Sequence, residues 1–510
     1  MIARARWPLG WRRALAALVL LAVSPLVAHV GSPDTWFEGR AGAYPVRVSV
    51  RTPGVVPGLA DITVRVIGGG ATSVTVQPYR WDVGPGGAPP PDPAAPVPGD
   101  AELWSAQLWF MAFGSHSVDV RVEGPLGGGA VVVPVMAVAT RTKAMDPALG
   151  AVLGVLGLLL AAGVVSIAAA AAREASLPPG AEADAPRKRR GWLAMAGAAG
   201  VLALLLTAGR GWWNAVEADY RRNLFRTYAP AVQASGSGAE SRLALALNDS
   251  TWGRGRRFSP LMPDHGKLMH LFLVRDDLGA FAHLHPVARD SAHFDSPLPA
   301  LPAGTYRLYA DIVHESGFAQ TLEQRVTLDA SPRAGALGAD EAMVADVAPA
   351  AAGSSFTFAD GTTVAWRDAP SAAGQEGTLA FALEDKAGRP LVPEPYLGMA
   401  GHLILTRDDG AVFVHLHPSG TASMAAQLRL ALRQRGDTSR AAYDSAVAAM
   451  AADDAHEAHR GHGAALADGA LLRFPYAFPQ PGRYRLWVQF RVGGTVRTAV
   501  FATEVQAPSS

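Results

Sequence analysis

Two long apolar runs are the feature that most constrains the fold of this chain. Residues 147–172 and 191–209 carry no charged side chain, and each run is long enough to cross a bilayer as a helix of roughly 20 residues. The short stretch between them, 173–190, contains Arg173, Arg187, Lys188, Arg189 and Arg190. Positive residues on a short loop indicate the cytoplasmic side. We therefore predict a two-helix transmembrane hairpin in the cytoplasmic (inner) membrane, with the flanking regions extracytoplasmic and the lipid bilayer as a partner.

The first 28 residues have the pattern of a signal peptide. Four arginines precede an apolar stretch, and small residues lead to a predicted cleavage after Ala28. Export and the hairpin together place residues 29–146 and the whole region after residue 209 outside the cytoplasm. In a bacterium with two membranes this compartment is the periplasm.

Composition limits the chemistry that these outer regions can carry. The chain has no cysteine, which excludes disulfides, thiolate metal sites and cysteine nucleophiles. Lys+Arg and Asp+Glu are nearly balanced at 45 and 44, so nothing predicts a nucleic-acid partner. Short alternating runs separated by Gly and Pro favour strands. The predicted fold class is mainly β, with three immunoglobulin-like β-sandwich domains and the two-helix hairpin. The sandwiches are expected at 29–146, 220–330 and 345–507.

An internal repeat is the most informative pattern in the C-terminal region. HLFLVRDDLGAFAHLHP begins at His270 and HLILTRDDGAVFVHLHP begins at His402. Each segment is predicted to be a β-hairpin, and Asp409-Gly410 is a strong two-residue turn signal. The second repeat also carries a His-rich, Ala-rich insert, 419–470, which we expect to be partly helical.

Pairing about these turns brings three histidines to one face in each hairpin. His270 is expected opposite His285 and His402 opposite His417, while residues two apart on a strand share a face. Three neutral imidazoles with an open fourth position suit zinc or copper. The envelope location favours copper, with Met269 and Met399 as possible soft ligands. The primary predicted metal ligands are His270, His283, His285, His402, His415 and His417.

Other histidines form a secondary set of candidates. His265 and His314 are near the first hairpin, and short His-rich tracts such as HEAHRGH in the insert often capture metal. Cleavage after Ala28 would make His29 the first residue, and its α-amine and imidazole could chelate copper together with His116. The secondary set is His29, His116, His265, His314, His456, His459 and His462.

The N-terminal region, from HVGSPDTWFEG to GSHSVDVRVEG, loosely resembles periplasmic copper-handling β-sandwich proteins of the CopC-like and YtkA-like kind. That resemblance implies a copper carrier with an N-terminal histidine ligand, and only His29 matches it. The further ligand motif of the family is not clearly present. No family is identified for the HLHP repeats.

Three functions remain open at this point. The first is a membrane-anchored, non-enzymatic metal-binding protein for copper or zinc resistance, storage or delivery, which would work with another envelope metal-handling protein. The second is a non-enzymatic scaffold with structural histidines. The third is a copper- or zinc-dependent enzyme, which is disfavoured because the repeated pairs Asp276-Asp277 and Asp408-Asp409 lie at the turn end of each hairpin. No catalytic residue is predicted.

Overall fold

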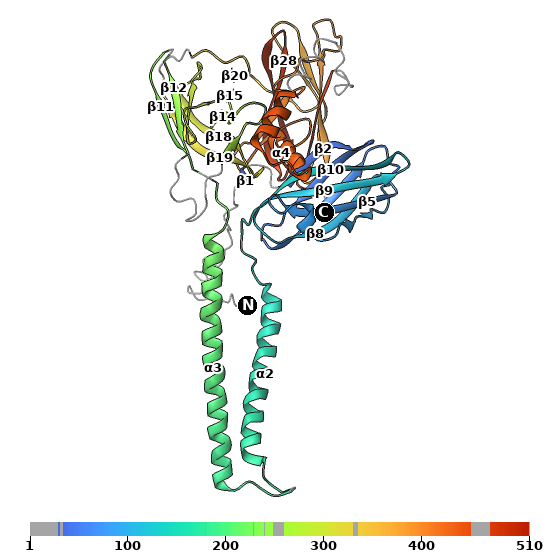
Figure 1. The fold of residues 1–510 in the computed structure, drawn as a ribbon. Helices are drawn as coiled ribbons and strands as arrows, with labels where there is room; N and C mark the ends of the chain where they lie inside the picture. The colour runs from blue at the N-terminus through green and yellow to red at the C-terminus, as the bar shows by residue number, and fades with distance from the viewer. Residues whose placement is uncertain are drawn as a thin grey trace, which may run out of the picture. The chain divides into compact units, whose positions relative to one another are not determined.

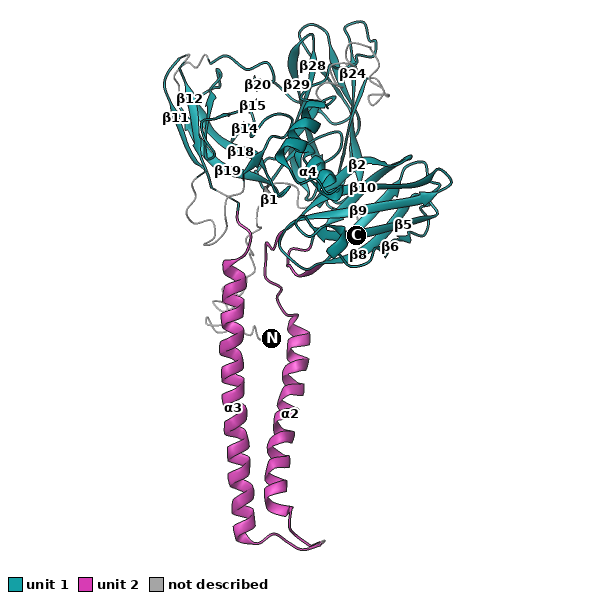
Figure 2. Ribbon diagram, viewed as in Figure 1, with its two compact units in different colours: residues 1–52, 59–137, 227–510 teal, residues 53–58, 138–226 magenta. Residues whose placement is uncertain are grey.

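The structure is a computed structural model that describes residues 29–30, 34–178, 180–227, 229–238, 240–247, 260–329, 335–449 and 470–508. It divides into two compact units, coloured separately in Figure 2. One contains the β-sheets and the other the two long helices. The prediction of a mainly-β fold with two long apolar helices is confirmed. The signal peptide and the HEAHRGH tract lie outside the described residues.

The helical unit consists of α2 (Pro147–Glu174) and α3 (Ala185–Arg222), which pack along each other (Figure 1). Asp146 and Asp184 cap the two N-termini by accepting from the Leu149 and Arg187 backbone N–H groups, and a proline follows each cap. Helix α3 extends beyond the apolar run at both ends. Both helices are long and apolar enough to cross a membrane.

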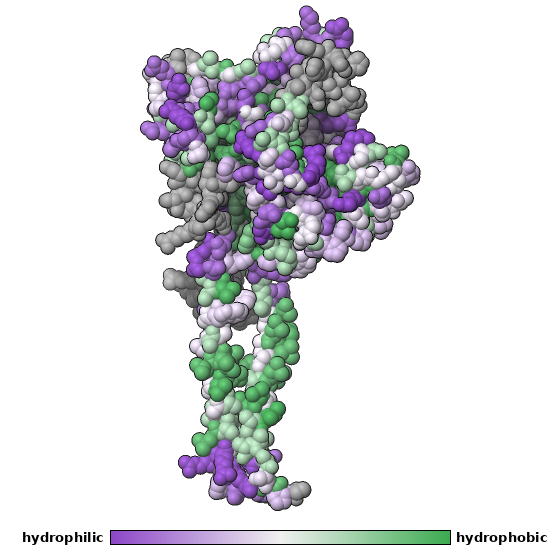
Figure 3. All heavy atoms as spheres, in the orientation of Figure 1, coloured by the Kyte–Doolittle hydropathy of each residue, from purple (hydrophilic) through white to green (hydrophobic). Residues whose placement is uncertain are grey.

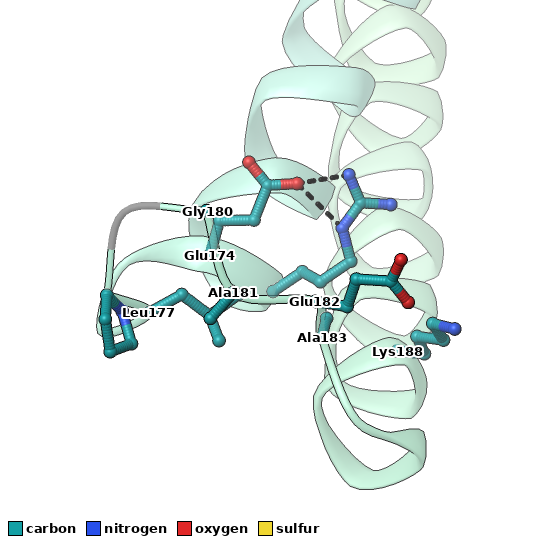
Figure 4. Close-up of a pocket in the computed structure, with 9 residues that line it drawn as sticks. Glu174, Leu177, Gly180, Ala181, Glu182, Ala183 and Lys188 are labelled. Atoms are coloured by element: carbon teal, nitrogen blue, oxygen red, sulfur yellow. Dashed lines mark hydrogen bonds and ion pairs between the residues drawn. The ribbon is translucent and has the colours of Figure 1, made fainter.

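The surface of the helical unit has the character expected of membrane-spanning helices. Leucines, valines and isoleucines such as Leu158, Leu160 and Ile167 are exposed along its length, and Figure 3 shows this apolar surface giving way to hydrophilic residues at the connecting loop. The loop surrounds a shallow polar depression lined in part by Arg173, Glu174 and Lys188, with Arg173 paired to Glu174 (Figure 4).

The N-terminal region forms a pair of sheets. The first sheet has the order β2-β3-β4-β8-β7 and the second β10-β9-β5-β6. Their strands are β2 (Asp34–Ala41), β3 (Tyr44–Arg51), β4 (Gly58–Val66), β5 (Ser73–Arg80), β6 (Asp92–Pro93), β7 (Ala95–Pro96), β8 (Leu103–Phe110), β9 (Gly114–Gly124) and β10 (Gly127–Ala137). Alternating valines on β3 and β4 are buried between them, as the sequence alternation predicts.

The region of the first HLHP segment also forms two sheets, which enclose one apolar core. The smaller has the order β11-β12-β17-β16 and the larger β13-β18-β14-β15-β20, with β19 paired to β18. Their strands are β11 (Ala231–Ser235), β12 (Arg242–Ala246), β13 (Leu261–Met262), β14 (His270–Arg275), β15 (Ala280–Leu284), β16 (Val287–Ala288), β17 (His293–Pro297), β18 (Gly304–His314), β19 (Ala319–Leu328) and β20 (Ala342–Ala345).

The region of the second HLHP segment has a corresponding pair of sheets. The smaller has the order β22-β23-β24-β27 and the larger β1-β26-β25-β28-β29-β21. Their strands are β1 (His29–Val30), β21 (Ala350–Ala351), β22 (Ser355–Thr357), β23 (Thr363–Asp368), β24 (Gly377–Glu384), β25 (His402–Arg407), β26 (Val412–Leu416), β27 (Leu471–Tyr476), β28 (Gly482–Val492) and β29 (Thr495–Val505). The insert begins with helix α4 (Met424–Gln434), so its helical part agrees with expectation. The immunoglobulin-like assignment of the three regions stays a prediction.

The two larger sheets of the C-terminal region pack face to face. Phe281 stacks on Trp487 with ring centroids 4.6 Å apart, and Phe413 stacks on Tyr309 at 3.8 Å. These aromatic residues belong to a buried cluster drawn from both sheets. Each larger sheet is therefore buried on both faces, one against its own smaller sheet and the other against its counterpart. This explains why β14 and β25 are apolar at nearly every position instead of alternating.

The N-terminal sheets are fastened to the segment that follows the second HLHP. The Glu38 N–H donates to the Ser419 carbonyl oxygen, and the Trp36 N–H donates to Thr421 Oγ1. Gly420 lies between these bonds with φ +107°, and a Cβ there would come within 2.0 Å of the Trp36 carbonyl oxygen. Only glycine permits this close approach.

Candidate metal centre

Both HLHP hairpins have the register that their turns predict. Leu271 pairs with Leu284, and Leu403 pairs with Leu416, so His270 faces His285 and His402 faces His417 across their hairpins. The histidines lie on the side of β14, β15, β25 and β26 that faces the other large sheet, because they alternate with core leucines. They occupy one end of the seam between the sheets, beside the stacked aromatic residues.

The structure brings the three histidines of each hairpin together. In His270, His283 and His285, and again in His402, His415 and His417, one nitrogen from each ring lies within 4.8 Å of the others. We call these groups the first and second triads. All six residues are at most 8% exposed. The triads also approach each other, since the ring centroids of His270 and His415 are 5.5 Å apart.

Burial holds the imidazoles neutral near pH 7. It lowers the pKa of His270 to about 4 and that of His417 to about 3, and it lowers the pKa of His283, His402 and His415 well below the usual value. A neutral imidazole offers one nitrogen lone pair, which is the form that binds a metal ion. The triads are therefore in the protonation state that coordination requires.

The tautomers of the first triad follow from its neighbours. His270 Nε2 is 3.1 Å from the Asp264 carbonyl oxygen, which only accepts, so Nε2 carries the proton and Nδ1 the lone pair. Gln489 donates from Nε2 to Thr498 Oγ1, and its Oε1 accepts from His283 Nδ1 at 2.8 Å. The His283 lone pair is then on Nε2. Two lone pairs thus face each other between His270 Nδ1 and His283 Nε2, which are 3.2 Å apart.

The second triad repeats this arrangement. His402 Nε2 is 3.2 Å from the Tyr396 carbonyl oxygen, and His402 Nδ1 is 2.9 Å from His415 Nε2. His415 Nδ1 is 3.2 Å from Asp311 Oδ2, so an ionised Asp311 again places the two lone pairs face to face. Two nitrogens, each about 2.0–2.1 Å from a tetrahedral zinc ion, lie about 3.3 Å apart. The 3.2 Å separation in the first triad is close to this value, and the 2.9 Å separation in the second is shorter.

The outer partners of the two triads are exchanged between the sheets. Gln489, on β28 of the second large sheet, holds His283 of the first hairpin, while Asp311, on β18 of the first, holds His415 of the second. Asp311 and Gln489 occupy equivalent positions, since they pair with His270 and His402 respectively. Burial raises the pKa of Asp311 to about 7. Sequence reasoning missed both residues because they lie far from the HLHP motifs in the chain.

His265 joins the histidines from a loop and completes a cluster of seven rings. Its ring centroid is 4.8 Å from that of His417, and Asp264, His265 and His417 form a third group with metal-binding potential. Burial raises the pKa of Asp264, but the adjacent imidazoles, His265 first, outweigh this and lower it overall. His265, His285 and His417 are buried without a hydrogen-bond partner on either ring nitrogen. Such orphaned polar groups are costly unless a ligand satisfies them.

The remaining sequence candidates lie elsewhere. His314 on β18 is bonded to Gln320, and His116 on β9 contacts the Gly114 carbonyl oxygen and packs against Phe110. The backbone of His29 pairs with Val412 on β26. The copper brace of His29 with His116 stays a prediction. His456, His459 and His462 lie outside the described residues. Met269 packs in the apolar core enclosed by the two sheets of the first HLHP region, and its role as a ligand stays a prediction.

A family model described as a domain of unknown function (DUF8832) matches residues 231–330, 357–443 and 439–507. These stretches contain both triads. No curated protein matches the chain. Among solved structures, it is similar to an engineered protein (23% identity, 18% of this chain and 19% of that one, TM-score 0.15), to Salmonella alpha-2-macroglobulin (10%, 94% and 24%, 0.18) and to a chimeric titin Z1Z2 (10%, 56% and 100%, 0.13). The chain thus spans about a fifth of the first of these. TM-scores this low define no common fold.

Proposed function

We propose that this chain is a membrane-anchored metal-binding protein of the bacterial envelope that handles copper, or alternatively zinc, for resistance, storage or delivery. The observation that carries the proposal is the close approach of two ring nitrogens in each triad, His270 Nδ1 to His283 Nε2 at 3.2 Å and His402 Nδ1 to His415 Nε2 at 2.9 Å, in a buried cluster. Where both nitrogens carry lone pairs, a cation bound between them removes their repulsion. The chemistry of the donor set fits, because imidazole suits both copper and zinc.

The proposed location follows from the helices and their connecting loop. Helices α2 and α3 would anchor the protein in the inner membrane, with the basic loop on the cytoplasmic side and the histidines outside. A bound ion would be nearly enclosed, which suits holding and handing over an ion more than turning over a substrate. Another envelope metal-handling protein is the partner that delivery would require.

Metal content measured by mass spectrometry on the full-length protein in detergent tests the proposal. Wild-type protein loaded with Cu(I), Cu(II) or Zn(II) should retain at least one equivalent after desalting. The double variant His283→Gln/His415→Gln should lose it, because glutamine cannot replace the imidazole lone pair in this geometry. The matched control is His293→Gln, which changes an exposed histidine paired with Asp290 and should keep the metal.

A second candidate is a scaffold whose histidines are structural, and one observation favours it. Asp311 has a pKa raised to about 7 by burial, so a protonated carboxyl could donate to His415 Nδ1. His415 Nε2 would then carry a proton and donate to His402 Nδ1 without any metal. Negligible metal in both the wild type and the double variant, after loading with all three ions, would make this candidate the leading one.

A further inference from the structure

The two triads differ in the loop that adjoins them. The loop before His270 contains Asp264 and His265, and the equivalent loop before His402 contains Tyr396 and Leu397. The loops share one backbone form. His265 and Leu397 both have positive φ, at 50° and 52°. Reciprocal backbone bonds join Asp264 to Lys267 in one loop and Tyr396 to Met399 in the other. The difference is therefore one of side chains on an equivalent backbone.

The His265 side chain belongs spatially to the second triad, although its loop precedes the first. Its ring is 4.8 Å from His417 and 5.4 Å from His402 between centroids, against 6.0 Å from His270. The side chain is completely buried, and both of its nitrogens lack a hydrogen-bond partner. A ligand atom of Asp264 also lies within 4.8 Å of those of His265 and His417.

The insert holds this loop in place. The Ala425 N–H, in the first turn of α4, donates to Asp264 Oδ1 at 2.8 Å, and the Tyr443 hydroxyl donates to the Pro263 carbonyl oxygen at 2.6 Å. Tyr443, Ala425 and Ala426 also form a buried cluster with Met262. The start of the insert thus fixes the carboxylate and imidazole beside His417, in addition to any role of its His-rich tract.

The first triad has no corresponding additional ligands among the described residues around it. Leu397 offers no ligand atom. The Tyr396 hydroxyl donates to the Asp340 carbonyl oxygen and lies 3.3 Å from His283 Nδ1, the nitrogen that carries the proton. Glu341 also adjoins His285, but its Oε1 accepts the His285 backbone N–H and its Oε2 accepts the Gly338 N–H. Its carboxylate is therefore already committed to the backbone.

We infer that the two triads form non-equivalent metal sites, and that the first repeat completes the site of the second. His265 and Asp264 extend the second triad to a higher-coordinate site with one carboxylate, whereas the first triad is a three-histidine site. Imidazole with carboxylate suits Zn²⁺ or Cu²⁺ better than Cu⁺. The second site is therefore the tighter one for a divalent cation. This inference rests on the proposed function, because it assumes that the triads bind metal.

Calorimetric titration of Zn²⁺ into full-length, chelator-stripped protein in detergent tests this inference. The wild type should bind two equivalents in two resolved steps. The variant His265→Leu introduces leucine, the side chain that the equivalent position of the other loop, Leu397, already has. It should weaken the tight step by more than the roughly 10- to 100-fold typical of losing an outer-shell partner, and leave the weak step unchanged. The converse variant, Leu397→His, should strengthen the weak step.

Asp264→Asn is the companion variant in case His265→Leu disturbs folding. It keeps an oxygen for the Ala425 N–H and removes the negative charge, so it should weaken the tight step alone. Two indistinguishable Zn²⁺ sites that neither variant changes would overturn the inference and leave the proposed function standing. A single equivalent lost in both His283→Gln and His415→Gln would also overturn it, in favour of one shared site. No Zn²⁺ binding by the wild type would overturn the inference, and failure of Cu(I) and Cu(II) to bind as well would overturn the proposed function.

Discussion

His283 Nδ1 lies 2.8 Å from Oε1 of Gln489, a residue 206 positions later in the chain and on the opposing large sheet. In the same way, Asp311 on the first large sheet contacts His415 on the second. A histidine ligand normally donates its second ring N–H to such a partner, which fixes the tautomer and the orientation of the ring. The side chains that orient His283 and His415 are thus supplied by the opposing large sheet.

Replacing Gln489 should weaken the first triad specifically. Gln489→Leu removes the acceptor for His283 Nδ1–H and leaves that buried group unsatisfied, so Zn²⁺ affinity at the weaker calorimetric step should fall about 10- to 100-fold. Gln320→Leu is the matched control, because Gln320 is a buried glutamine bonded to His314, outside the triads. An equal loss in both variants would mean that the effect is one of general destabilisation.

Metal binding should release a proton from Asp311 but none from the histidines. The histidines have lowered pKa values and are already neutral at pH 7, whereas the pKa of Asp311 is raised to about 7. Coordination of His415 through Nε2 leaves Nδ1–H to donate to an ionised Asp311, so a protonated Asp311 must lose its proton. Calorimetry at pH 6 in buffers of different ionisation enthalpy should give close to one proton released. In Asp311→Asn the release should disappear.

The metal-free protein should lose stability as the pH falls below about 6.5. In the unfolded chain each histidine gains a proton near pH 6.5, while in the folded chain burial delays this to about pH 4 for His270 and about pH 3 for His417. The unfolded state therefore binds more protons in this interval. Asp311 acts oppositely, since its raised pKa favours the folded state as the pH falls from about 7. Because several histidines oppose one aspartate, the urea midpoint should decrease between pH 6.5 and pH 4.

A midpoint that rises over that interval would contradict the burial of neutral imidazoles. Bound Zn²⁺ should raise the midpoint at pH 7, because a ligand that binds only the folded state stabilises it by mass action. The double variant His283→Gln/His415→Gln should show a shallower dependence on pH in the metal-free form. A shallower pH dependence of the urea midpoint in the double variant than in the wild type would assign that dependence to the triads.

Substituting Gly420 should loosen the N-terminal sheets from the second HLHP segment. In Gly420→Ala the new Cβ would meet the Trp36 carbonyl oxygen at 2.0 Å, and φ is +107°. The loss of stability should exceed the roughly 1–3 kcal/mol of backbone strain alone. Gly436→Ala is the control, because Gly436 also has positive φ, at 85°, but nothing lies within 4 Å of its Cβ position. Thermal unfolding of both variants measures the difference.

The hairpins could be predicted from the sequence because their signals are local. Asp409-Gly410 fixes the turn, and the period of two along a strand then determines which histidines face each other. The face-to-face packing of the large sheets was not predicted. Its signal is present in HLFLVR and HLILTR, which lack the polar alternation of a sheet with one solvent-exposed face.

His265, Gln489 and Asp311 show where sequence reasoning stops. His265 was only a secondary candidate, since it lies in a loop whose positive φ no periodicity reveals. Gln489 and Asp311 are ordinary strand residues, and their role depends on which sheet lies opposite them. Aligning the two repeats pairs Asp311 with Gln489 and His265 with Leu397, which would have identified the positions but not their contacts.

The exchange of Gln489 and Asp311 also sets an order of events for the newly made chain. A ribosome that has completed the first hairpin has made all three of its histidines, yet the acceptor that orients His283 is still 206 residues away. The hydrogen bond from His283 Nδ1 to Gln489 cannot form until synthesis has passed residue 489 and the two large sheets have packed together. If the first triad binds metal, a nascent chain should therefore hold the ion more weakly than the finished protein does.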